Sequence, residues 1–185
     1  EISWCYAGPA TDECAFDGGD GGGLSIRGGT LHGNTVSIRD CRAKRNGGGL
    51  EATSGSLVVL NASRLERCQR HEGFYGQGAA IYTAHTANVT MHNTTVSKCH
   101  SELLGGTLYI EGDLKMMNES TVTQCHWKGV SVSGSYESAE TGGIIIVLGQ
   151  GRLTMTNSSV EKCTLIDPRS TDSTDPAAVR ESSRY

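Results

Sequence analysis

The sequence predicts an all-β fold, a right-handed parallel β-helix (solenoid) of about five rungs with an N-terminal cap and a polar C-terminal tail. Three observations support this prediction. Glycine is abundant, with 25 of 185 residues, while aromatic residues make up only 5%. A Gly-Gly … Asn … Cys pattern recurs along the chain, and alternating apolar and polar residues lie within each copy. A narrow core that repeats along an axis suits this composition, because each repeat packs only against its neighbours.

The clearest part of the repeat ends in a cysteine. Each copy has a branched aliphatic residue, two polar residues and then Cys41, Cys68, Cys99, Cys125 or Cys163. These cysteines are 27, 31, 26 and 38 residues apart, which fits solenoid turns that carry loops of different length. Stacked rungs lie about 4.8 Å apart. We therefore expect a cysteine column, formed by small buried apolar side chains or, with less favourable geometry, by disulfides.

An asparagine precedes each repeat cysteine by six or seven residues, at Asn34, Asn61, Asn93, Asn118 and Asn157. Before it lies an alternating stretch, such as Val89-Thr-Met91, which is typical of a half-buried strand. We expect the asparagines to turn a corner of each rung, where the amide of one can bond to the asparagine of the next rung. Glycine clusters such as Gly47-Gly-Gly-Leu50 would form the other tight corners.

A helical fold and a β-sandwich are the structural alternatives. Glycine and β-branched residues are poor helix formers. A sandwich would show turn signals every few residues, without equivalence at spacings of 27 to 38. We therefore expect a cap over residues 1–17, a β-helix over 18–166 with a protruding loop at Lys128 to Thr141, and a polar tail over 167–185. A disulfide between Cys5 and Cys14 would fit within the cap.

The repeat resembles that of the pectate-lyase-like right-handed parallel β-helix superfamily. Its Gly-Gly-x-aliphatic half, as in Gly105-Gly-Thr-Leu108, is similar to the repeats of chlamydial polymorphic membrane proteins and related autotransporter passengers. The resemblance covers residues 18 to 165. The Phe-x-x-Asn motif of those proteins is missing, because the chain has only two phenylalanines. The resemblance thus implies the fold and not an adhesin, since this fold hosts lyases, hydrolases, adhesins and spacers.

The repeat positions do not bring a catalytic pair together. Hydrolases of this fold need paired carboxylates at a set separation. Acidic residues lie one or two positions before three of the repeat cysteines, at Asp40, Glu66 and Glu161, but the third and fourth copies have Lys98 and Gln124 there. We find no calcium cluster of the kind the resemblance would imply for a lyase, and no C-x-x-C motif for zinc. We therefore expect a protein that is not an enzyme and has no metal or cofactor.

Two groups of residues are candidates for interaction. A basic run could meet an anionic partner, although a solvated loop rim is the simpler interpretation. The second group is a pair of tyrosines at similar repeat positions, which with Tyr75 could form a stacking platform for a glycan. The basic run consists of Arg39, Arg42, Lys44 and Arg45, and the tyrosine pair is Tyr82 and Tyr109. The net charge of −4 gives no reason to expect nucleic acid, and no apolar run is long enough for a transmembrane segment.

Five N-x-[ST] sequons occur, at Asn61, Asn88, Asn93, Asn118 and Asn157. In a secreted eukaryotic protein such sequons predict glycans. Four of them are the repeat asparagine, which could not carry a sugar if it faced inward. Asn88 is therefore the expected glycosylation site. The seven cysteines suit an oxidising compartment, either extracellular or in an organelle lumen.

The sequence leaves two functional hypotheses. The first is a non-catalytic structural or interaction β-helix with protein partners, docking on a larger assembly through its loops, cap and tail. It would be an accessory subunit at a cell surface or in an organelle lumen, for which a photosynthetic membrane complex is one setting. The second hypothesis is a carbohydrate-binding or polysaccharide-degrading β-helix protein.

Overall fold

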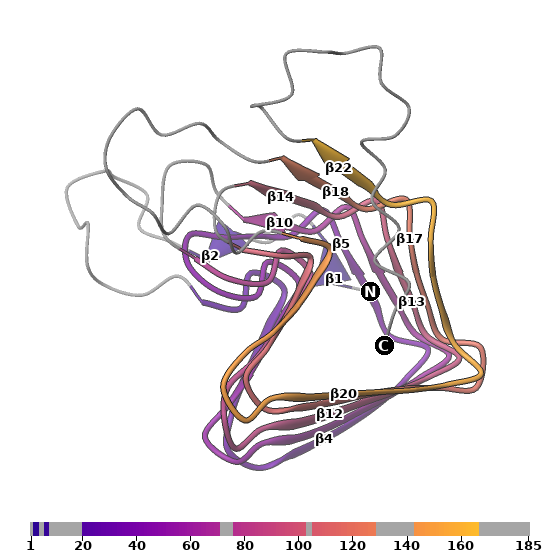
Figure 1. Ribbon diagram of the computed structural model, residues 1–185. Coiled ribbons are helices and arrows are strands. Elements are labelled where there is room, and N and C mark those ends of the chain that lie inside the picture. The colour runs from indigo at the N-terminus through magenta and orange to yellow at the C-terminus, as the bar shows by residue number, and fades with distance from the viewer. Residues whose placement is uncertain are drawn as a thin grey trace, which may run out of the picture.

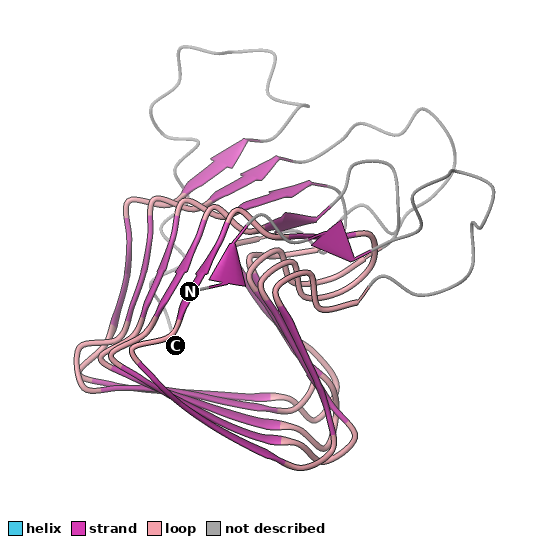
Figure 2. Cartoon of the chain, turned by 180° about the vertical axis from the view of Figure 1, so that it is seen from behind, coloured by secondary structure: helices cyan, strands magenta, loops and turns pink. Residues whose placement is uncertain are grey.

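The computed structural model describes residues 2–3, 6–7, 20–70, 76–102, 105–128 and 143–166. In these residues the chain winds around a central axis as a coil of short parallel strands (Figure 1). Figure 2 shows the same coil from behind, with rungs of similar, roughly triangular outline stacked on one another. The Cys5–Cys14 pair, residues 129–141 of the expected long loop and the expected tail lie outside the described residues.

Each rung contributes strands to four parallel sheets, which we name A to D. Sheet A contains β1 (Ile2–Ser3), β5 (Ser37–Arg39), β9 (Arg64–Glu66), β13 (Thr95–Ser97), β17 (Thr121–Thr123) and β21 (Ser159–Glu161). Sheet B contains β2 (Tyr6–Ala7), β6 (Arg42–Ala43), β10 (Gln69–Arg70), β14 (His100–Glu102), β18 (His126–Lys128) and β22 (Thr164–Ile166). Sheet C contains β3 (Leu24–Arg27), β7 (Leu50–Thr53), β11 (Ile81–Thr83), β15 (Leu108–Ile110) and β19 (Ile145–Val147). Sheet D contains β4 (Thr30–Asn34), β8 (Leu57–Asn61), β12 (Asn88–His92), β16 (Asp113–Met117) and β20 (Arg152–Thr156).

The parallel β-helix predicted from the repeat is confirmed, and five or six strands per sheet agree with about five copies. The coil also reaches into the segment expected to be the cap. There, Ile2 pairs with Ile38 of sheet A, and Tyr6 pairs with Arg42 of sheet B. The first rung therefore begins before residue 18.

The core consists of columns of equivalent side chains along the axis. On sheet A, Ile38, Leu65, Val96 and Val122 follow one another in register, and each is at most 1% exposed. On sheet D, Leu60, Met91 and Met116 form another column and are fully buried. Alternate residues of these strands point outward, as the pleat requires. The sequence repeat therefore specifies the inside of the coil.

The corners of the coil depend on special backbone conformations. The residue before each repeat cysteine has a φ between 53° and 55°, and a second set at the corner between sheets D and A has a φ between 46° and 53°. The first set is Asp40, Arg67, Lys98, Gln124 and Lys162, and the second is Thr35, Ala62, Asn93, Asn118 and Asn157. At a further corner only glycine fits, because a Cβ on Gly48 would lie 2.3 Å from the carbonyl oxygens of Ala79 and Gln69.

Candidate functional site

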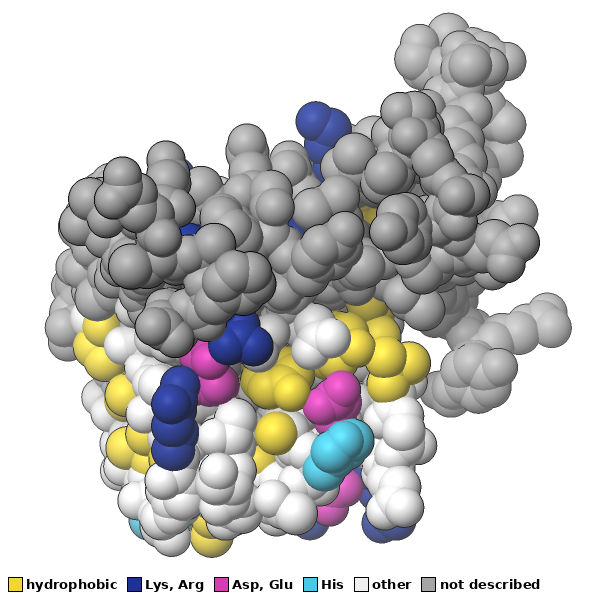
Figure 3. Space-filling model, turned by 90° about the vertical axis from the view of Figure 1, so that its left-hand side faces the viewer, with side chains coloured by type: hydrophobic (Ala, Val, Ile, Leu, Met, Phe, Trp, Pro, Cys, Tyr) yellow, Lys and Arg dark blue, Asp and Glu magenta, His cyan; other side chains and the backbone are white. Residues whose placement is uncertain are grey.

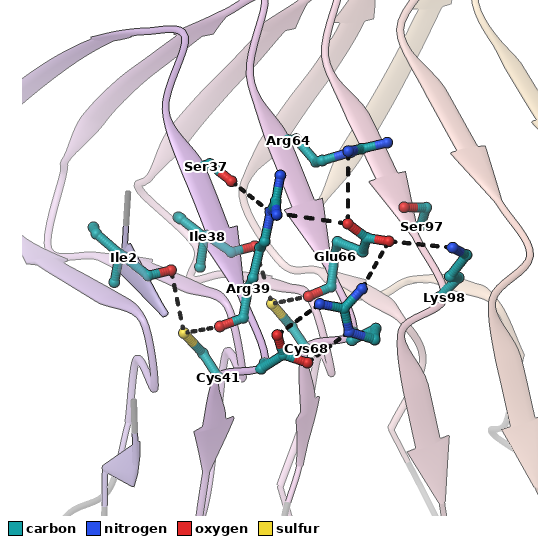
Figure 4. Close-up of polar contacts among 12 residues, drawn as sticks. Ile2, Ser37, Ile38, Arg39, Cys41, Arg64, Glu66, Cys68, Ser97 and Lys98 are labelled. Carbon is teal, nitrogen blue, oxygen red and sulfur yellow. Dashed lines mark hydrogen bonds and ion pairs between the residues drawn. The ribbon is translucent and has the colours of Figure 1, made fainter. Parts of the chain in front are cut away.

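Sheet A carries a cluster of charged side chains on its outward face, centred on Glu66 of β9 (Figure 4). The Glu66 Oε1 atom lies 2.9 Å from Nη1 of Arg67 and accepts a hydrogen bond from Nζ of Lys98 at 3.2 Å. Its Oε2 atom lies 3.7 Å from Nη1 of Arg64 and 3.9 Å from Nε of Arg39. Four cations from successive rungs therefore surround one carboxylate. We refer to Arg39, Asp40, Arg64, Glu66, Arg67 and Lys98 as the sheet A charge cluster.

A second carboxylate fixes the guanidinium of Arg67. Its Nε and Nη2 atoms donate to the two oxygens of Asp40, at 2.6 and 2.7 Å. This two-point contact is the strongest kind of ion pair for an arginine. The hydrogen bond from Arg67 holds the pKa of Asp40 below its ordinary value. Asp40 and Arg67 are both corner residues that precede repeat cysteines, so the corner conformation places them one above the other.

The carboxylates of the cluster lie deeper than its cations. The Glu66 and Asp40 side chains are 7% and 15% exposed, whereas those of Arg39, Arg64, Arg67 and Lys98 range from 34% to 53%. Burial alone would raise the pKa of Glu66, but the hydrogen bond from Lys98 and the charges of Arg64 and Arg67 outweigh it and lower that pKa. The cluster thus turns a positive surface toward solvent on a chain whose net charge is −4.

The four residues of the basic run do not lie together in one patch. Arg39 joins the charge cluster on sheet A, but Arg42 is exposed on β6 of sheet B, Lys44 is buried and Arg45 is exposed at the next corner. Neighbours in sequence separate here because the chain turns a corner at Asp40, between β5 and β6. The true neighbours of Arg39 lie at equivalent positions of later copies, so they could have been found by aligning the repeats.

Tyr82 and Tyr109 are direct neighbours on sheet C, with ring centroids 5.9 Å apart. They are only 9% and 5% exposed, so the predicted stacking platform for a glycan is contradicted. Their hydroxyls are also engaged: that of Tyr82 donates to Glu111 at 2.9 Å, and that of Tyr109 accepts from Gln77 at 3.0 Å. Figure 3 shows this side of the molecule, where apolar side chains lie among acidic, basic and histidine side chains. Tyr75 lies outside the described residues.

The five repeat cysteines occupy equivalent places, and none of them forms a disulfide with another cysteine of the described residues. Cys41, Cys68, Cys99 and Cys125 are fully buried, and Cys163 in the last rung is partly buried. The Cys99 Sγ atom donates to the carbonyl oxygen of Ser97, two residues earlier, and the other four make the same contact. Burial raises the pKa of the Cys99 thiol. The interpretation as small buried side chains therefore accounts for them.

The repeat asparagines do not face inward, so an inward ladder does not prevent them from carrying a sugar. Asn34, Asn93, Asn118 and Asn157 are exposed, and Asn61 is partly exposed. Asn34 and Asn61 are the last residues of their sheet D strands. The other three, Asn93, Asn118 and Asn157, have the positive φ of the corner. One bond between repeat asparagines occurs in the described residues, from Nδ2 of Asn61 to Oδ1 of Asn34 at 3.0 Å.

The inward place at this corner is taken by hydroxyl side chains, which the sequence analysis missed. Ser63, Thr94 and Ser120 are at most 5% exposed and lie one above the other. The backbone N–H of Ser63 donates to Oγ1 of Thr94 at 3.3 Å, and that of Thr94 donates to Oγ of Ser120 at 3.2 Å. Each hydroxyl thus satisfies a backbone group of the previous rung. The signal was present as a Ser or Thr one or two residues after each asparagine from Asn61 onward.

Together, the parallel coil, the columns of core residues and the buried cysteines define a solenoid in which the repeated residues form the fold. A family model described as a right handed beta helix region matches residues 7–160, so the chain belongs to the right-handed β-helix family. No match was found among curated proteins or among solved structures. Within the described ranges no helix is long and apolar enough to span a membrane. The same residues hold no group of three or more His, Cys, Asp or Glu side chains placed to bind a metal ion.

Proposed function

We propose that this protein is a non-catalytic interaction β-helix that docks on a larger assembly through the outward face of sheet A. The observation that carries this proposal is the sheet A charge cluster. Its cations come from three successive rungs and are held in place by two carboxylates that lie beneath them. A rigid set of cations loses little side-chain freedom on binding, which favours association.

The chemistry of the cluster indicates an acidic protein surface as the partner. Arg39, Arg64 and Arg67 present guanidinium groups, which match carboxylates in two-point contacts. The cluster has four cations and two carboxylates, so it keeps two positive charges after its internal pairs are counted. Charge of this kind steers an oppositely charged surface into place. The assembly would lie at a cell surface or in an organelle lumen.

The test starts from the native complex. The native protein is extracted under mild, low-salt conditions, and its size is compared with that of the free chain. We expect it to migrate with a larger assembly and to be released by salt. Recombinant chain is then added back to the stripped assembly. The control variant is Arg152→Glu, which changes an exposed arginine on sheet D. The proposal is supported if the wild-type chain and Arg152→Glu rebind while Arg64→Glu/Lys98→Glu does not. A free monomer in the extract, or equal rebinding by the Arg64→Glu/Lys98→Glu chain, overturns it.

A further inference from the structure

The five sequons of the chain fall into two structural groups. At Asn61 and Asn118 the fold itself explains the motif. The hydroxyl residues of these sequons, Ser63 and Ser120, are members of the buried corner column that bonds successive rungs. The asparagines are engaged as well: Nδ2 of Asn61 donates to Asn34, and Nδ2 of Asn118 lies 3.2 Å from Nδ1 of His92. These two motifs are therefore a consequence of the repeat.

The sequons at Asn88, Asn93 and Asn157 have no such explanation. Their hydroxyl residues are Thr90 on β12, Thr95 on β13 and Ser159 on β21, all at outward positions of the sheets. Non-hydroxyl residues occupy the same register positions, because Thr95 pairs with Arg64 and Thr90 pairs with Val59 and Lys115. The Thr95 hydroxyl accepts one long bond, from Oγ1 of Thr121 at 3.4 Å, outside the corner column. In these rungs the hydroxyl next to the asparagine is that of Thr94 or Ser158, and each contacts the carbonyl oxygen two residues earlier, at 2.9 Å for Thr94 and 3.0 Å for Ser158.

The asparagine amides of this second group are also accessible. Asn88, Asn93 and Asn157 are exposed, and their side chains make no hydrogen bond within the described ranges. A sugar on any of the three would extend into solvent. A sugar on Asn61 or Asn118 would instead meet the side chain of the neighbouring rung, which lies within about 3 Å of the same nitrogen.

The spacing of the rungs supports the same division. Asn61, Asn93, Asn118 and Asn157 lie at the same corner in four successive rungs, and rungs are about 4.8 Å apart. Sugars on all four would crowd one another. Asn93 and Asn157 are separated by two rungs, or roughly 10 Å, which leaves room for a glycan on each. Asn88 is the first residue of the five-residue strand β12, and Asn93 directly follows its last residue, so the two asparagines lie at opposite ends of that strand.

We propose that the protein is N-glycosylated at Asn88, Asn93 and Asn157 and not at Asn61 or Asn118. In this reaction the amide nitrogen Nδ2 forms a bond to C1 of the first sugar of a lipid-linked oligosaccharide. The bond from C1 to the pyrophosphate oxygen breaks, the lipid pyrophosphate leaves, and the amide proton passes to a base of the transferase. The inference requires passage through a secretory compartment and is independent of the docking proposed for sheet A.

The test measures occupancy of each sequon in the native full-length protein. The purified protein is treated with a peptide N-glycosidase in heavy-oxygen water, which converts each glycosylated asparagine into a labelled aspartate, and peptides are analysed by mass spectrometry. We expect label at Asn88, Asn93 and Asn157 and none at Asn61 and Asn118. Absence of label at all three sites, or equal label at Asn61 and Asn118, overturns the proposal.

Sequon variants provide a second readout that does not alter the asparagines. The full chain is secreted from eukaryotic cells with Thr90→Ala, Thr95→Ala or Ser159→Ala, and its mobility on a denaturing gel is compared before and after deglycosylation. Each variant should lose one glycan step. Thr123→Ala, an outward sheet A threonine outside any sequon, is the matched control and should lose none. Unchanged mobility of all three sequon variants contradicts the proposal.

Discussion

The middle rungs and the last described rung are built from the same columns, yet they differ greatly in burial. Met91 and Met116 of sheet D are fully buried, whereas Met155, the next member of their column, is 39% exposed. On sheet A, Val122 is fully buried and Val160, its neighbour in register, is 40% exposed. Within each pair the residue type is the same and the two residues lie on equivalent strands. Burial in this molecule is therefore conferred by the next rung, and the energetic weight of a residue depends on its place in the stack.

The largest difference is expected for truncation of the methionine column. Met116→Ala should lower the free energy of unfolding by about 2–5 kcal/mol, because it leaves a cavity between two rungs. Met155→Ala should cost about 1 kcal/mol, because solvent already reaches that side chain. Denaturant unfolding of both variants measures the comparison. Equal losses would show that the last rung is covered as fully as the middle rungs.

The hydroxyl column should show the next largest effect. Thr94→Val leaves the backbone N–H of Ser63 without its acceptor inside the coil and should cost about 1–3 kcal/mol. The matched change in the last rung is Ser158→Ala, whose hydroxyl contacts the carbonyl oxygen of Thr156 near the surface. It should cost less than about 1 kcal/mol. A neutral Thr94→Val variant in the same unfolding experiment would argue against a structural role of the column.

The columns also show which structural features could be predicted from the sequence. Repeat spacing and strand alternation predicted the coil because they recur in every copy. The exposure of the repeat asparagines was not predicted, because the repeat pattern does not tell which residue of the corner turns inward, a place that Ser63, Thr94 and Ser120 take. The register of Tyr82 and Tyr109 was predicted, but their burial was not. The charge cluster was missed in part because Arg39 and Lys98 reach Glu66 only through the register of separate copies.

Glu66 and Glu161 allow a pH test of the same comparison, because both occupy the outward column at the end of sheet A strands. The pKa of Glu66 lies below its ordinary value of 4.5, so its ionised form stabilises the fold above that pH, and this contribution is lost as the pH falls. Glu66→Gln should lower stability at neutral pH by about 1–2 kcal/mol, and the difference should shrink in acid. Exposed Glu161→Gln should change stability little. A pH-independent loss for Glu66→Gln would contradict this account.

The smallest effect concerns thiol reactivity and does not require unfolding. In a Cys5→Ser/Cys14→Ser background, Cys163 should react with an aromatic disulfide reagent roughly tenfold faster, or more, than Cys99. Cys163 is partly exposed, whereas Cys99 is fully buried and its thiol is shielded from the reagent. Cys163→Ser should remove the fast phase of the reaction. A single rate for all five thiols would show that access does not follow the position of the rung.

The contrast between inside and outside leads to the functional claim. The inward columns recur in nearly every rung, so the fold alone explains why their residues repeat. The outward charge cluster on sheet A is not repeated in the later rungs, where Thr121, Thr123 and Ser159 take the corresponding places. We therefore assign recognition to Arg39, Arg64, Arg67 and Lys98, and stability to the repeat.

The most direct test measures binding and unfolding on the same proteins, with poly-glutamate as an acidic probe. Arg64→Gln/Lys98→Gln should weaken binding about tenfold and change the free energy of unfolding by less than about 1 kcal/mol, because exposed ion pairs contribute little. Arg152→Gln, on sheet D, should leave binding at the wild-type level. Equal binding by all three proteins, or an equal loss for Arg152→Gln, would contradict the assignment of recognition to sheet A.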